Sequence, residues 1–70
     1  MRIEVSGSDA QSIISALHVA VRDDLDKGYI HTAADNLRIA KMFLSSVDSI
    51  HRDVYARSAL ELSEYIDAAL

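Results

Sequence analysis

The feature that most constrains this chain is an apolar seam that runs through residues 28–47, GYIHTAADNLRIAKMFLSSV. The seam consists of large residues seven positions apart and small residues between and after them, namely Ile30, Ala33, Leu37, Ala40, Leu44 and Val47. This spacing of three and four puts the six side chains on one face of a helix, as in helices that pack side by side. We therefore expect residues 30–47 to form the central helix of a small helical domain.

Two more helices are expected on either side of this segment. Proline is absent and glycine occurs only at Gly7 and Gly28, so little interrupts a helix. Ser8 and Gln11 have the spacing of a capping box, which predicts a first helix over about residues 9–26. Gly28 follows at the position where a left-handed C-terminal cap is common.

A third helix is predicted over about residues 50–69, with Asp48 or Ser49 as its cap. Its apolar face comprises Val54, Tyr55, Ala59, Leu62, Ile66 and Ala69. Residues 1–7 are predicted to form a short extended arm, because Ile3 and Val5 alternate with charged residues. The expected fold is a single all-α domain over residues 1–70, a small antiparallel three-helix bundle.

Part of the central segment resembles the inter-helix turn and second helix of a tetratricopeptide repeat. The matching residues are Gly28, Ile30, Ala33, Leu37 and Ala40. In that family the turn glycine lets two helices meet closely, and the small residues let them pack. The resemblance covers about twenty residues. It stops in the first helix, where Leu17, Ala20 and Val21 replace the family's aromatic residue, leucine and glycine. It implies a helical hairpin in this chain and not membership of the family.

Composition favours association with other chains. Seventy residues bury only about 60% of their unfolded surface, and no cysteine is present to add a disulfide. Half of the residues are nevertheless hydrophobic. We expect a homodimer or a permanent heteromer. The buried surface would be the arm at Ile3 and Val5, or a second stripe on the central helix formed by Ile39, Met42 and Phe43.

Charge narrows the classes of partner. The net charge of −4 disfavours non-specific binding to nucleic acid or to an anionic membrane. No apolar run approaches the ~20 residues that span a bilayer, and no signal-peptide pattern opens the chain. A cytoplasmic protein is expected.

No motif predicts catalysis, a metal site or a cofactor. His18, His31 and His51 lie on separate segments without a His-x-x-x-His pair, so we expect surface or cap histidines and no zinc site. No serine lies in a nucleophile motif, and no glycine-rich phosphate loop is present. We expect a protein that is not an enzyme.

A helix-turn-helix DNA-binding protein is the least favoured alternative. The basic residues that could contact phosphate are Arg38, Lys41, Arg52 and Arg57. The third helix also carries Asp53, Glu61, Glu64 and Asp67, which phosphate would repel.

The remaining class is a protein-binding module. Asp23, Asp24 and Asp26 lie at the end of the first helix, where acids oppose the helix dipole and could contact a basic partner. Tyr29 and Phe43 are aromatic residues of the kind that anchor interfaces. We predict a small acidic module that binds a larger protein, as an inhibitor or regulator of the phage anti-defence (anti-CRISPR-like) type. The alternative is a small helical chaperone or adaptor that covers an apolar helix of its partner.

Overall fold

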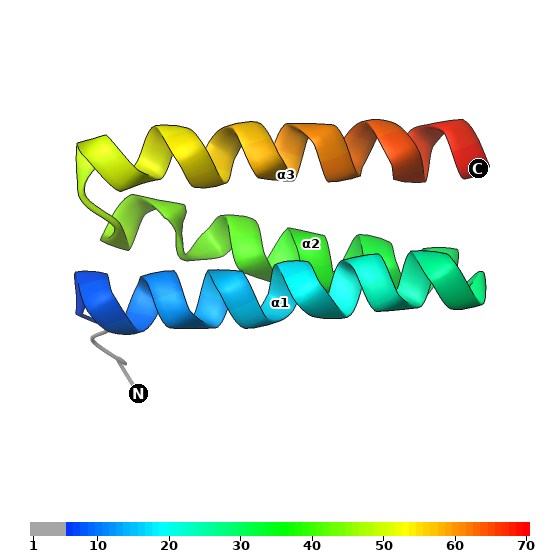
Figure 1. Ribbon diagram of the computed structural model, residues 1–70, viewed down its shortest axis with the longest axis horizontal. Helices are drawn as coiled ribbons and strands as arrows, with labels where there is room; N and C mark the ends of the chain where they lie inside the picture. The colour runs from blue at the N-terminus through cyan, green and yellow to red at the C-terminus, as the bar shows by residue number, and fades with distance from the viewer. Residues whose placement is uncertain (1–5) are drawn as a thin grey trace.

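The computed structural model describes residues 6–70, which form three α-helices and one short 3-10 turn. The elements are α1 (Gly7–Lys27), α2 (Ile30–Met42), η1 (Leu44–Ser46) and α3 (Ser49–Ala69). Successive helices run antiparallel, and α2 lies between α1 and α3 (Figure 1). The all-α three-helix bundle expected from the sequence is confirmed. Residues 1–5 of the predicted arm lie outside the described residues, and Gly7, its last residue, belongs to α1.

The three helices form a flattened layer, with overall dimensions of 33 × 27 × 15 Å. α2 packs most closely against α1, and α3 also contacts α1 through two side-chain hydrogen bonds. The hydroxyl groups of Ser15 and Tyr55 lie 3.2 Å apart, and Arg22 donates a hydrogen bond to Ser58 at 3.4 Å. Because the layer is thin, each helix keeps a wide solvent-facing surface.

Two apolar clusters hold the layer together. The first joins all three helices and contains Val21, Ala33, Leu37, Ala59, Leu62 and Ile66. The second lies where α1 begins and η1 ends, and contains Ala10, Ile14 and Val47, with Phe43, Leu44 and Tyr55 packed against it. The seam predicted for residues 30–47 is therefore the inward-facing side of α2 and η1. Its three small residues and Leu37 are buried, and Ile30 and Leu44 are half-buried.

The predicted start of the first helix is wrong. The N-cap is Ser6, whose hydroxyl accepts a hydrogen bond from the backbone N–H of Asp9 at 3.1 Å. The competing box at Ser8 would have begun the helix later. Asp9 remains in the first turn, where a negative charge is favourable, and Ala10 is fully buried in the second cluster.

The second helix is shorter than the sequence indicates, since α2 ends at Met42 and not at residue 47. The chain then turns through η1, which directs Val47 into the core. Arg52 holds this turn by donating from Nε to the Leu44 carbonyl at 3.0 Å and from Nη2 to the Val47 carbonyl at 2.7 Å. The hydrogen bonds from Arg52 to these carbonyls replace those of a continuing helix. The apolar spacing within residues 30–47 does not reveal them.

Of the two candidate caps for α3, the structure uses Asp48. Its carboxylate accepts hydrogen bonds from the backbone N–H of His51 at 3.1 Å and is 2.8 Å from the His51 Nδ1. These two contacts, the backbone bond foremost, lower the pKa of the Asp48 carboxyl group. The cap and the Arg52 bonds together fix where α3 begins.

Gly28 ends α1 in the left-handed conformation, with φ of 82°. We predict that Gly28→Val lowers the free energy of unfolding by about 1–2 kcal/mol, the cost of a left-handed residue with a side chain. Nothing lies within 4 Å of an added Cβ, so the loss reflects backbone strain and not a clash. Gly28→Asn is the control and should lose less, because asparagine tolerates this conformation. Urea unfolding measures both, and equal losses would contradict the backbone argument.

Candidate protein-binding surface

The turn between α1 and α2 positions the acidic and aromatic residues singled out in the sequence. The backbone N–H of Gly28 donates to the Leu25 carbonyl at 3.2 Å, and that of Tyr29 donates to the Asp24 carbonyl at 2.8 Å. These bonds satisfy the last carbonyls of α1 and fix the direction in which α2 leaves the turn. Tyr29 keeps 57% of its surface exposed beside the end of α1.

The three acids of this turn have three different environments. Asp23 forms an ion pair with Lys27 at 2.9 Å, and both side chains are more than half exposed. Its hydrogen bond, and then its charge, raise the pKa of Lys27. Asp24 is partly buried and accepts a hydrogen bond from the Asn36 amide at 2.9 Å, which joins α1 to α2. Asp26 is exposed and forms no side-chain hydrogen bond or ion pair with the described residues. The predicted cluster is thus one unpaired acid, one paired acid and one structural acid.

Phe43 does not belong to this surface. It caps the far end of α2, about 20 Å from the turn at 1.5 Å per helical residue. There it is half-buried against the cluster of Ala10, Ile14 and Val47. We define the turn surface as Asp23, Asp26 and Tyr29.

A hollow of about 330 Å³ adjoins the turn surface on the side of α3. It is lined by Arg22, Leu25, Asp26, Leu62 and Tyr65. Tyr65 is 68% exposed. It lies one position before the buried Ile66 in α3 and is therefore turned away from the core.

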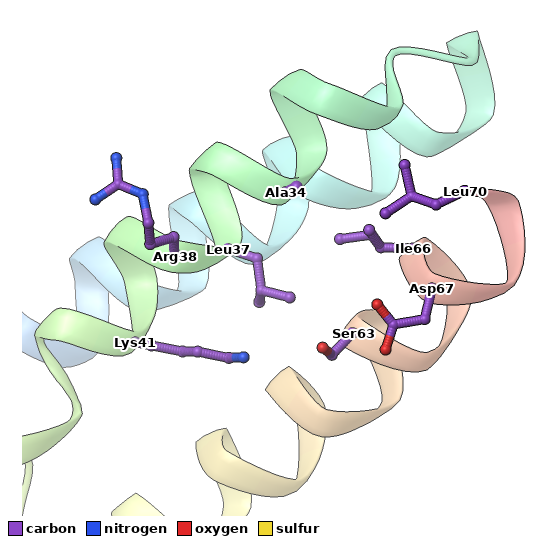
Figure 2. Close-up of a pocket in the computed structure, with 8 residues that line it drawn as sticks. All are labelled: Ala34, Leu37, Arg38, Lys41, Ser63, Ile66, Asp67 and Leu70. Carbon is purple, nitrogen blue, oxygen red and sulfur yellow. The ribbon is translucent and has the colours of Figure 1, made fainter.

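A second hollow, which we call the groove, lies on the surface between α2 and α3 and is shown in Figure 2. Its floor is apolar and includes Leu37 and Ile66, and its volume is about 240 Å³. That is below the range of about 300–1,000 Å³ typical of small-molecule sites, so the groove suits one or two apolar side chains. Lys41 extends across the opening toward Ser63, whereas Arg38 points away from it (Figure 2).

The basic residues considered for DNA binding are partly engaged elsewhere. The guanidinium group of Arg52 is bound to carbonyl oxygens around η1, and Arg38 lies 3.5 Å from the carboxylate of Asp35.

The expectation that all three histidines lie at the surface is wrong for His18, which is only 4% exposed. His18 follows Ile14 by four residues and precedes Val21 by three, so it shares their buried face. Its ring meets that of Tyr55 edge to face, with centroids 6.3 Å apart. Burial, and then the charge of Arg22, lower the pKa of His18. His31 and His51 are exposed. Within residues 6–70, no three histidine or acidic side chains gather closely enough to hold a metal ion.

Known protein families, curated proteins and solved structures give no match to this chain. No helix in the described part of the chain is both long enough and apolar enough to cross a membrane.

The buried His18 predicts a fall in stability with acidification. Since its folded pKa is lowered, the unfolded chain takes up the proton first as pH drops through the usual value of 6.5. The contribution of neutral His18 to the free energy of unfolding is fully present above pH 6.5. It is lost as the pH falls from that value toward the lowered pKa of the folded state. We expect His18→Phe, which keeps an aromatic ring beside Tyr55, to reduce the slope of melting temperature against pH between neutral and mildly acidic pH. His31→Phe is the exposed control and should leave the slope unchanged, and equal slopes in all three proteins would contradict the prediction.

The different environments of Asp24 and Asp26 predict different costs of removal. Asp24→Ala should lower the free energy of unfolding by about 1–2 kcal/mol, because it removes a charged hydrogen bond between two helices. Asp26→Ala should change it by less than about 0.5 kcal/mol, since the side chain is exposed and unpaired. Chemical denaturation of the two variants provides the comparison. A loss at Asp26 as large as that at Asp24 would show that the Asn36 contact does not stabilise the hairpin.

Proposed function

We propose that this protein is a small acidic interaction module that binds a larger protein, as an inhibitor or regulator of the phage anti-defence (anti-CRISPR-like) type. The observation that carries the proposal is the turn surface, where the exposed Asp26 and Tyr29 lie three residues apart in one hydrogen-bonded turn. Tyrosine is among the residue types that are enriched in binding hot spots. A cytoplasmic location and a role without catalysis are part of this proposal.

The mode of action follows from charge and rigidity. The net charge of −4 attracts a basic surface on the partner, such as a groove in which that partner binds nucleic acid. This attraction speeds the encounter of the two proteins. Tyr29 then docks as the anchor. Because the backbone bonds of Gly28 and Tyr29 already fix the turn, little ordering cost is added on binding.

The groove between α2 and α3 supports the second candidate, a chaperone or adaptor that covers an apolar helix. Its floor of Leu37 and Ile66 lies between two helices, where apolar side chains from a third helix would fit (Figure 2). Leu70, at one end of the groove, is 71% exposed.

Three sets of variants separate these candidates. A binding protein captured from the source organism is purified, and its dissociation constant is measured for each set. We expect the combined change Asp23→Lys, Asp26→Lys and Tyr29→Ser to weaken binding at least about tenfold, and more at low salt. Asp24 is left intact because it joins α1 to α2.

The other two sets are Leu70→Asp, and His31→Ala combined with His51→Ala. Both should leave affinity unchanged if the turn surface binds the partner. Loss of binding in Leu70→Asp with an unaffected turn variant would favour the chaperone. Loss in the histidine variant alone would contradict both candidates. Circular dichroism checks that each variant keeps its helices.

A further inference from the structure

α3 carries more exposed large apolar side chains than any other element of the described residues. Of the eight large apolar side chains that are more than half exposed, four lie on α3 and a fifth, Leu70, directly follows it. The four are Ile50, Val54, Leu60 and Tyr65. α1 and α2 contribute one each, Val19 and Met42. The fully inward face of α3 is narrow in comparison, since its buried residues are only Ala59, Leu62 and Ile66.

A heptad-like stripe runs along the solvent-facing side of α3. Its members are spaced alternately by four and three residues, and are Ile50, Val54, Arg57, Glu61, Glu64 and Ala68. All six are exposed. At 100° per residue the stripe lies on the side of α3 opposite the buried residues. We call it the outer stripe.

The surface of the outer stripe contains a socket for a side chain from another helix. A hollow of about 380 Å³ is lined by Glu61, Glu64, Tyr65 and Ala68, which are all on α3. These occupy positions i, i+3, i+4 and i+7, the four that form a hole in knobs-into-holes packing. Because no residue of α1 or α2 lines it, the hollow opens away from the bundle.

We propose that a second copy of this chain docks on the outer stripe, with its α3 antiparallel to the first. In this register Arg57 of each copy faces Glu61 of the other, and Val54 of each enters the other's hollow. Ile50 meets Ala68 at both ends. The arrangement has a two-fold axis that crosses the outer stripe midway between Arg57 and Glu61, so that the same surface serves both copies.

The charges determine the orientation. A parallel pair would put Arg57 against Arg57 and Glu61 against Glu61, whereas the antiparallel pair forms two attractive contacts. None of the ion pairs that the structure shows in residues 6–70 involves Arg57 or Glu61, so both are available. Glu64 within the stripe and Asp53 beside it add negative charge, which limits affinity. Contact along one helix is also near the lower end of stable interfaces, about 1,200 Å² in total, so a dimer that forms at micromolar concentrations is expected.

This surface differs from those that the sequence predicted. On the second stripe of the central helix, Ile39 and Phe43 are half-buried and only Met42 is exposed. The self-association site goes beyond the proposed function and does not depend on it. The C-terminal end of α3 and the turn surface lie at the same end of the bundle (Figure 1), so an antiparallel dimer would hold its two turn surfaces at opposite ends.

Charge reversal tests the proposal. Sedimentation velocity over a wide range of concentrations should show wild-type protein passing from monomer to dimer. Arg57→Glu and Glu61→Arg should each weaken self-association at least about tenfold, because each converts attraction into repulsion. The double variant Arg57→Glu with Glu61→Arg should restore it. Val54→Asp should also abolish the dimer, and Val19→Asp, at a 64% exposed site on α1, is the matched control that should not.

Three results would overturn the proposal. One is a wild-type protein that stays monomeric at the highest concentration. Another is a dimer that none of the α3 variants weakens, which would place the interface elsewhere. The third is a double variant that fails to recover while its circular dichroism stays helical, which would exclude the antiparallel Arg57–Glu61 contact. All of these positions are exposed, so the substitutions leave the core intact.

Discussion

The packing of small side chains around α2 is the constraint on which the rest of the structure depends. Ala33 and Ala40 are fully buried, and Ala10 is equally buried at the start of α1. With no side chain beyond Cβ, these residues let neighbouring helices approach closely, but each removes little apolar surface from water. The largest fully buried side chains are Ile14, Val21 and Val47. The core therefore depends on tight packing more than on large residues.

Polar contacts set the ends of the helices within this packing. Gly28 reverses the chain after α1, while Arg52 and Asp48 define the turn before α3. The Asp24–Asn36 hydrogen bond then fixes the first hairpin across its two helices. Each of these contacts joins residues on two elements or closes one helix end. They give a short chain the definite turns that a small alanine-rich core would not specify alone.

A thin layer leaves apolar side chains in contact with water. The turn surface combines charge with one aromatic residue, whereas the outer stripe combines apolar residues with a self-complementary pair of charges. We propose the first as the site for a basic partner and the second as the site for an identical chain.

The sequence by itself determined the helical class, the three helices and the inward face of α2, because heptad spacing, few breakers and the Gly28 cap are local properties. It also placed acids and Tyr29 at the turn. Only the tertiary structure decided that α2 ends at Met42, since Arg52 reaches back from α3 to bind the carbonyls of Leu44 and Val47. Likewise, only the packing of the helices distinguishes Asp24, which bonds to Asn36, from the exposed Asp26. Packing also buries His18 beside Tyr55 and places Phe43 away from the turn surface. The physical reason is the same in each case: a side chain's environment depends on the neighbouring helix that covers it, and periodicity within one helix does not specify that neighbour.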